Sequence, residues 1–217
     1  MDWPLLEGVA DEDRTRVLSA AVRRRFARNE VVFHDGDPGD TLHLLAKGRV
    51  AVRVTTPLGD VALLAVLGAG EVFGEQALIS AGARRTGTVI ALEPVETLAL
   101  VRAQFEGLRR RHPSVDRFLV RVLEERLARV SARLLEALYL PADVRVLRRV
   151  GELADLYGDG RLPTVVPMTQ ENLAAMAGTT RSTVNRVLRA AEKRGAVALR
   201  RGSTEIVAPD LLRRLAR

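Results

Sequence analysis

The sequence predicts an α+β fold: an N-terminal, jelly-roll-like β-roll, one long helix, and a C-terminal winged helix-turn-helix. Three observations predict this order. Short β-rich runs separated by glycine turns extend from Glu30 to about Val101, and leucines then recur at helical spacing from Pro113 to about Tyr139. The last part of the chain has the pattern helix, turn, helix, strand, turn, strand. We therefore expect three parts, at residues 1–112, 113–139 and 140–217.

Composition limits the class of protein. The chain has 217 residues, 47% of them hydrophobic, and a formal net charge of +7. It contains no apolar run near the roughly 20 residues that cross a bilayer, and "MDWPLLEGV" lacks the basic start of a secretory signal, so we expect a cytoplasmic protein with no membrane partner. The positive charge favours polyanionic partners, although a coding bias toward arginine would give the same balance.

The reactive side chains argue against several kinds of site. There is no cysteine, which excludes disulfides, thiolate zinc sites and cysteine-ligated iron–sulfur clusters. The histidines, His34, His43 and His112, do not have metal-ligand spacing; a haem held by one of them stays open as an alternative. Because no nucleophile–base pair or metal motif is evident, we expect neither a metal nor catalysis.

The N-terminal region predicts helices up to about residue 27. In "DEDRTRVLSAAVRRRF", acids occupy the first turn and arginines the last, which matches the helix dipole. Arg23, Arg24 and Arg25 are interpreted as a solvated helix end.

The segment "GEVFGEQALISAGARRTGTV" has the residues that a buried phosphodiester requires. Such a group needs a guanidinium, hydroxyl or amide donors, and a carboxylate that accepts from ribose hydroxyls. Gly74 allows the backbone to come close, Glu75 is the acceptor, and Arg85 and Thr86 are the donors; a short helix beginning near Glu75 would add amides. We expect Arg84 to face solvent, although a shift of register would exchange it with Arg85.

The long helix has a single apolar stripe, with spacings of 4, 4, 3, 4 and 4 residues. Its members are Leu119, Leu123, Leu127, Val130, Leu134 and Leu138. Pro113 suits the first turn and Pro141 the exit. A stripe this long must be covered, either by the same helix of a second subunit in a parallel homodimer or by the chain's own β-roll.

After "YLPAD", Asp143 is expected to cap a helix that runs to about Tyr157. In the following helix-turn-helix, Thr169 and Thr180 are the expected helix caps and Gly178 the left-handed turn residue. The predicted buried sides of the two helices are Leu173, Ala174, Met176 and Ala177, and Val184, Val187 and Leu188.

The exposed side of the second helix predicts contact with DNA. A recognition helix enters the major groove with its N-terminal end first, where an arginine can bond guanine with two donors. The expected base-facing residues are Arg181, Ser182, Asn185 and Arg186, and the expected phosphate contacts are Thr169, Thr179, Thr180 and, on the wing around Gly202, Arg200 and Arg201. The alternative is a helical hairpin with a solvated arginine face.

These motifs carry a family resemblance. "FHDGDPGDTLHLLAKGRVAV" and the segment after it resemble a cyclic nucleotide-binding domain, and the whole chain is similar to the Crp/Fnr superfamily of bacterial transcription regulators. The resemblance implies that Gly74 and Glu75 line the ribose and that Arg85 and Thr86 hold the cyclic phosphate of cyclic AMP. It also places Arg126 near Glu75 and Ser131 near the base.

In the reader, the resemblance assigns the base-reading trio to Arg181, Ser182 and Arg186. Two positions depart from the family pattern. Val130 precedes Ser131 where a cyclic AMP binder often has threonine, and Ser182 stands where the family usually has glutamate. Because glutamate accepts from cytosine, the second change should relax or alter one base position of the typical TGTGA half-site.

The sequence thus predicts a homodimeric regulator that binds a palindromic operator under cyclic nucleotide control. RNA polymerase is a further partner if the protein activates transcription, although no contacting patch is evident in the sequence. Two alternatives stay open: the same regulator with a vestigial sensor or another effector, and a nucleotide-binding module whose C-terminal part docks to protein.

Overall fold

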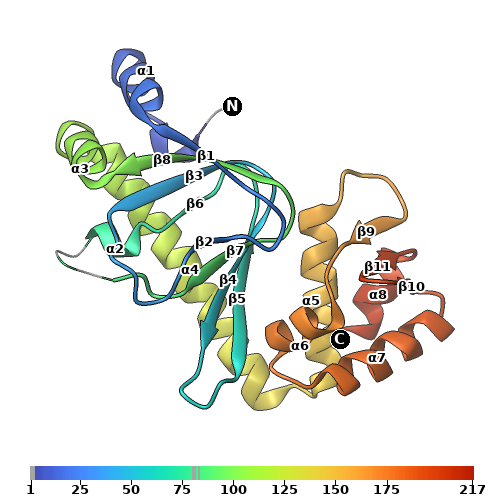
Figure 1. The fold of residues 1–217 in the computed structure, drawn as a ribbon. Coiled ribbons are helices and arrows are strands. Elements are labelled where there is room, and N and C mark those ends of the chain that lie inside the picture. Colours follow the sequence, from blue (N-terminus) through green and yellow to red (C-terminus); the bar gives the residue numbers. More distant parts are fainter. Residues whose placement is uncertain (1–2, 80–81, 83) are drawn as a thin grey trace. The chain divides into compact units, whose positions relative to one another are not determined.

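The computed structural model describes residues 3–79, 82 and 84–217, so Ser80, Ala81 and Ala83 of the predicted phosphodiester segment lie outside it (Figure 1). The chain divides into two compact units, 1–128 and 129–217, and the division falls inside the long helix α4 (Pro113–Tyr139).

The first unit contains two four-stranded antiparallel sheets, in the strand orders β1-β8-β3-β6 and β2-β7-β4-β5. The strands are β1 (Val22–Phe26), β2 (Val31–Phe33), β3 (Thr41–Lys47), β4 (Val50–Thr55), β5 (Val61–Leu67), β6 (Val72–Phe73), β7 (Thr88–Ala91) and β8 (Val95–Val101). The helices are η1 (Pro4–Leu6), α1 (Asp11–Ala20), α2 (Gln76–Ile79), α3 (Arg102–Arg111) and the first part of α4. The predicted β-roll is confirmed.

Strand β3 explains how this unit acquires two cores. Because side chains alternate along a strand, Leu42 and Leu44 point to one face and Leu45 to the other. Leu42 and Leu44 belong to a buried cluster with α3 and the start of α4, where Phe105 and Phe118 lie. Leu45 belongs to a second cluster built from both sheets, whose other members are Val50, Leu67, Phe73, Val89, Ala91 and Val95. The nearly continuous apolar run of β3 therefore reflects a strand that is covered on both faces.

The predicted helix up to residue 27 is wrong in its second half. Helix α1 ends at Ala20, and the arginines expected at a helix end lie on β1, which pairs with β8. Arg23 and Arg25, two positions apart, both bond Glu96 of β8, which requires the period-two geometry of a strand. Pairing with a strand some 70 residues away overrides the local helical preference, and no single window of sequence contains that partner.

The second unit begins within α4 and contains α5 (Ala142–Tyr157), α6 (Gln170–Ala177), α7 (Arg181–Lys193) and α8 (Pro209–Leu215). Its sheet has the order β10-β11-β9, from β10 (Val197–Arg200), β11 (Ser203–Ile206) and β9 (Thr164–Val166). This arrangement confirms the predicted winged helix-turn-helix, with the wing turning at Gly202. Helices α3 and α8 and strand β9 were not predicted, since each is short and its apolar residues fit no long period.

The two helix-turn-helix caps are confirmed in atomic detail. Thr169 and Thr180 accept hydrogen bonds from the backbone amides of Asn172 and Thr183, and Gly178 between the helices has φ +60°. The cap predicted for α5 is wrong. Pro141 occupies the N-cap position, and Asp143 lies in the first turn of the helix with its carboxylate bonded to Arg186.

Gly48 offers a stability test of the β-roll. It has φ +82°, and a β-carbon there would lie 2.4 Å from the carbonyl oxygen of Pro94. Gly59 has φ +91° but meets nothing within 4 Å. We predict that Gly59→Ala lowers the free energy of unfolding by about 1 kcal/mol and Gly48→Ala by about 3 kcal/mol or more, because only the second adds a clash to backbone strain. Urea unfolding followed by the fluorescence of the buried Trp3 measures both, and equal losses would contradict the clash.

Candidate effector site and DNA-reading surface

The guanidinium of Arg85 lies inside the β-roll, against the start of β3. Nη1 donates to the carbonyl oxygens of Thr41 at 2.8 Å and Gly74 at 3.0 Å, and Nη2 donates to Thr41 Oγ1 at 2.8 Å. The same group stacks 4.1 Å above the ring of Phe33. Only 4% of Arg85 is exposed, whereas Arg84 faces solvent and donates to Gly36, as the sequence predicted.

The positive charge of the buried Arg85 is only partly neutralised by nearby carboxylates. In the described part of the chain the carboxylate paired with it is Asp40, at 3.8 Å, whose side chain is 81% exposed. Burial lowers the pKa of Arg85, while Asp40, Asp37 and Glu75 oppose that shift. Its Nε is buried and has no hydrogen-bond partner among the described residues. A buried cation in this state is stabilised by any anion that can reach it.

Gly74 is required by the position of that guanidinium. It has φ +83°, and a β-carbon there would lie 2.5 Å from Arg85 Nη1 and 3.0 Å from the carbonyl oxygen of Thr41. The sequence analysis attributed this glycine to ligand approach; the structure shows that it first makes room for Arg85.

The side chain of Glu75 is fully buried. Arg126 of α4 donates to its Oε1 and, through Nη2, to the carbonyl oxygen of Val72 at 2.9 Å. The structure thus places Arg126 against Glu75, where the resemblance put it. Oε2 of Glu75 is buried without a partner among the described residues, which makes it an acceptor available to a hydroxyl donor.

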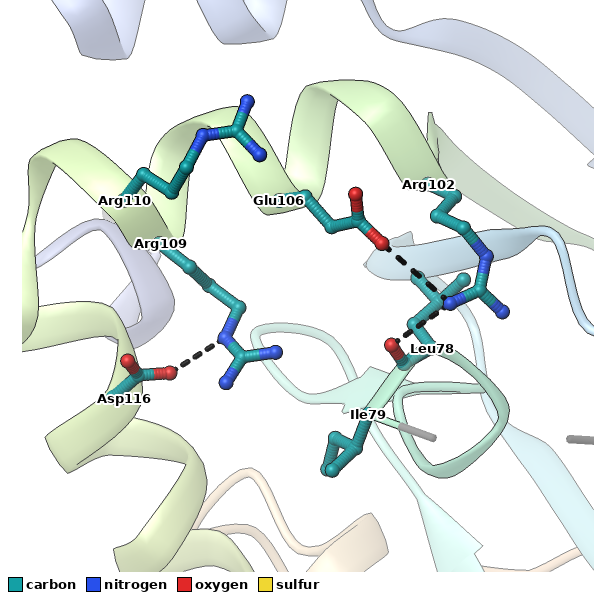
Figure 2. Close-up of a pocket in the computed structure, with 7 residues that line it drawn as sticks. All are labelled: Leu78, Ile79, Arg102, Glu106, Arg109, Arg110 and Asp116. Atoms are coloured by element: carbon teal, nitrogen blue, oxygen red, sulfur yellow. Dashed lines mark hydrogen bonds and ion pairs between the residues drawn. The ribbon is translucent and has the colours of Figure 1, made fainter. Parts of the chain in front are cut away.

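Arg102 of α3 fixes α2 from the outside (Figure 2). Its two Nη atoms donate to the carbonyl oxygens of Leu78 at 3.0 Å and Ala77 at 2.7 Å, at the C-terminal end of α2, and to Gly39 at 3.0 Å. A cation at this end satisfies carbonyls that have no partner in the helix. Figure 2 also shows Arg109 paired with Asp116 at the edge of a pocket that Arg102 and Leu78 also line. Arg102 also forms an ion pair with Glu106 at 3.6 Å, but the three hydrogen bonds that hold α2 and Gly39 all go to carbonyl oxygens, which no sequence motif marks.

His43 lies next to Thr41, the residue that accepts hydrogen bonds from Arg85. Its Nε2 lies 3.4 Å from Thr41 Oγ1 and its Nδ1 3.1 Å from Thr97 Oγ1, and its ring stacks on Phe73 with centroids 4.9 Å apart. Burial, followed by the nearby Arg85 cation, lowers the pKa of His43 to about 4. The imidazole is therefore neutral at physiological pH and serves the packing of the site.

The remaining predicted effector residues have different surroundings. Thr86 is exposed, and its hydroxyl donates to Gln76 Oε1 at 2.7 Å. Ser131 is exposed on the part of α4 that belongs to the second unit. Within the described ranges there is no cluster of three or more His, Asp or Glu side chains that could hold a metal ion, and no helix there is long and apolar enough to span a bilayer.

The predicted base-facing residues share the exposed side of α7. Arg181, Ser182, Asn185 and Arg186 are all exposed, while Val184, Val187 and Leu188 are buried as predicted. The Ser182 hydroxyl lies 2.8 Å from the cap oxygen of Thr180, and Asn185 donates to Gln170 at 3.1 Å.

The arginines of this surface fall into two groups. Arg181 on the helix and Arg201 on the wing have no polar partner among the described residues. Arg186 instead bonds Asp143, and Arg200 bonds Glu205 at 3.0 Å. The unpaired cations can meet phosphates or bases directly, and the paired ones only alongside a carboxylate.

Arg145 of α5 holds the turn of the helix-turn-helix. It donates to the carbonyl oxygens of Ala177 at 2.9 Å and Gly178 at 3.0 Å, and also to Leu140 at 2.8 Å. One side chain thereby joins the end of α4 to the turn that sets the direction of α7. Sequence reasoning missed it for the same reason as Arg102: all of its partners are carbonyls.

Comparisons with known proteins identify the family of each part of the chain. The family description "Cyclic nucleotide-binding domain" matches residues 23–112, and "Crp-like helix-turn-helix domain" matches residues 125–215. The Cyclic AMP receptor protein of Thermus thermophilus is 36% identical over 213 residues, which cover 98% of this chain and 96% of the relative. The CRP-like cAMP-activated global transcriptional regulator of Mycobacterium tuberculosis is 30% identical over 195 residues, covering 88% and 87%.

A solved structure shows the same fold at lower identity. The c-di-GMP responsive global regulator CLP of Xanthomonas campestris has a TM-score of 0.78 at 20% identity, covering 91% of this chain and 99% of that one. The comparisons confirm the resemblance that the motifs indicated.

His43 gives the sensor unit a predictable pH dependence. The unfolded chain takes up a proton near pH 6.5, but folded His43 stays neutral down to about pH 4. The contribution of His43 to the free energy of unfolding is therefore fully present above pH 6.5. It falls as the pH is lowered through this window, by about 1.4 kcal/mol per pH unit and about 3 kcal/mol in total. We predict that His43→Gln flattens this slope, measured by urea unfolding at pH 7, 6 and 5. The matched control His34→Gln, at an exposed position, should keep it; parallel curves for wild type and His43→Gln would refute the assignment.

Proposed function

This chain belongs to the Crp/Fnr family of transcription regulators, and we propose that it is a homodimer that binds a palindromic operator under the control of a cyclic nucleotide, foremost cyclic AMP. The observation that carries the sensor half of this proposal is the pair of buried, unpartnered polar atoms, Arg85 Nε and Glu75 Oε2.

A cyclic nucleotide has the two groups that these atoms lack. Its phosphodiester is an anion for the Arg85 guanidinium, and its ribose carries a hydroxyl that can donate to Glu75. The exposed Thr86 hydroxyl is the proposed second phosphate donor, and Arg126 orients the Glu75 carboxylate through its contact with Oε1. Ser131 is proposed to contact the base on the resemblance alone.

A second candidate is the same regulator with a different effector or none. Val130 before Ser131 departs from the cyclic AMP pattern. In addition, one protein of this fold is described as c-di-GMP responsive. Whatever the effector, it can shift DNA binding only by its difference in affinity for two conformations of the protein.

The DNA half of the proposal rests on the surface of α7 and the wing. Arg181 and Arg186 are the proposed readers of guanine, with Ser182 and Asn185 beside them at base edges. Thr169, Thr179, Thr180 and Arg201 are the proposed phosphate contacts, since they lie at helix starts or at the wing tip. Symmetry then predicts half-sites about 34 Å apart.

The proposed dimer contact is the apolar stripe of α4. In the second unit, the opposite face of this helix is bonded to α5: Glu136 pairs with Arg148 and Arg149, and Arg133 pairs with Glu152. The last four members of the stripe point away from those contacts, with Leu127 68%, Val130 57%, Leu134 59% and Leu138 64% exposed, whereas Leu119 is buried in the apolar cluster of the first unit. A second copy of the helix would bury these side chains in a parallel pair.

Leu134→Glu tests the dimer. We predict that it converts the protein to a monomer and weakens operator binding by about 100-fold or more, because two half-sites are then no longer bound together and a charge replaces a buried leucine. Analytical ultracentrifugation measures the mass. Ala132→Glu, which is exposed outside the stripe, should stay dimeric. A wild-type monomer at micromolar concentration would be inconsistent with the proposal.

Thr86→Val tests the effector. We predict that calorimetry detects cyclic AMP binding to the wild type and an affinity about 10- to 100-fold lower in the variant, the usual loss for a hydrogen bond to a charged group. Thr55→Val, an exposed threonine on the β4–β5 hairpin, is the matched control and should bind normally.

In parallel, selection from a random duplex pool at physiological salt, with cyclic AMP, with cyclic GMP or with neither, should yield a palindrome.

These outcomes test the effector-binding part and the DNA-binding part of the proposal separately. Selection of a palindrome without binding of either nucleotide would support the second candidate. Failure to prefer any duplex over another would remove the DNA-reading function itself.

A further inference from the structure

We propose that Asp143 is a positioning residue for DNA recognition, which holds the guanidinium of Arg186 so that this arginine discriminates between bases more than it binds phosphates. The inference rests on the proposed function and assigns a role to a residue that no motif marks.

The geometry is a two-point ion pair between different elements of the second unit. Arg186 Nη1 donates to Asp143 Oδ2 at 2.9 Å, and Nη2 donates to Oδ1 at 2.7 Å. Asp143 lies in the first turn of α5 and Arg186 in the second turn of α7. Such a fork-to-fork contact fixes both the place and the plane of the guanidinium.

This pair differs from the other charges on the surface. Arg189, one turn further along α7, bonds Glu192 of its own helix, and such pairs hold a side chain only loosely. Arg181 has no polar partner among the described residues and keeps its full conformational range. Arg186 is thus the arginine of the recognition surface that another helix orients.

The pairing leaves Arg186 able to read a base. A guanidinium has five N–H donors, and Asp143 takes one from each Nη. The Nε donor and a second donor on the neighbouring Nη remain on one edge, and guanine O6 and N7 need two donors side by side. The side chain of Arg186 is 64% exposed, so this edge is accessible to a ligand.

The carboxylate also changes what the arginine binds. Attraction to phosphate depends on net charge and is nearly independent of sequence, whereas a base contact depends on where the donors point. Asp143 cancels the charge of Arg186 and adds repulsion toward any phosphate near it, yet it fixes the donor edge. It should therefore weaken binding to random DNA more than binding to the operator, which is how repulsive elements create specificity.

Both partners are ionised at neutral pH. The hydrogen bond from Arg186 lowers the pKa of Asp143, and the same bond raises the pKa of Arg186. The pair is therefore a constant feature of the reader in the physiological range.

The test compares Asp143→Asn with wild type in the full-length dimer, on three duplexes: the selected operator, the operator with each guanine replaced in turn, and random sequence. We predict that binding to random DNA tightens about 3- to 10-fold, the effect of freeing one cation near phosphates, while binding to the operator changes less. Discrimination should fall at one guanine of each half-site, and the salt slope on random DNA should steepen by about 0.9 for each half-site.

Two controls isolate the contact. Asp210→Asn makes the same charge change on α8, where Asp210 pairs with Arg213 of its own helix, and should leave base discrimination and the salt slope unchanged. In an Arg186→Ala background, Asp143→Asn should no longer affect discrimination, because its effect passes through Arg186. Asp143→Glu, which keeps the charge, should retain most of the wild-type discrimination.

The results decide between a positioning role and a general effect of charge. Equal tightening on operator and random DNA, or an unchanged base profile, would overturn the inference. Loss of discrimination by Asp143→Asn that persists without Arg186 would also overturn it. If the wild type itself selected no duplex, the proposed function would fail first, and that result is seen before any variant is compared.

Discussion

The sensor unit depends on one buried cation. The guanidinium of Arg85 joins the start of β3, through Thr41, to the end of β6, through Gly74, and lies on the Phe33 ring of β2. Removing a cation from water is costly, and here carbonyl oxygens, a hydroxyl and an aromatic face offset only part of that cost. The same group that organises the interior of the roll is therefore the one on which the proposed effector site is based.

The neighbouring residues follow from that placement. Gly74 cannot carry a side chain because Arg85 occupies the space, and Glu75 is held by Arg126 from α4. Burial and the Arg85 cation lower the pKa of His43 to about 4, so its ring is neutral at physiological pH. Arg85 is thereby connected to the long helix, because it bonds Gly74 and the next residue, Glu75, bonds Arg126 of α4. In a family whose members regulate transcription, such a connection is the physical requirement for an effector to influence a helix that also takes part in the reader.

In the reader unit, arginine has three distinct uses. Arg145 bonds only carbonyl oxygens and fixes the turn before α7, and Arg149 is buried in an ion-pair network with Glu136 and Glu152. Arg181 projects from α7 with no polar partner in the part of the chain that the structure describes. The overall charge of +7 does not distinguish these uses. In the proposed function, the arginines without a partner supply the contacts with DNA, and the bonded ones, such as Arg145, fix the turn that sets the direction of α7.

The sequence by itself determined the long helix, the two threonine caps of the helix-turn-helix and its left-handed glycine turn. The period of the leucines, with Pro113 and Pro141 at the two ends, predicted α4, and the threonines and Gly178 predicted the helix-turn-helix, because each signal lies within one element or one turn. The spacing of Glu75 and Arg85 predicted the effector segment, and that assignment stays a prediction. Tertiary structure alone decided the rest. Arg23 to Arg25 became a strand because β8 is there to pair with, and Asp143 became the partner of Arg186, and not a cap, because α5 and α7 pack together. Those outcomes depend on contacts between residues 43 or more positions apart, and a local pattern carries no information about which distant group will be nearby.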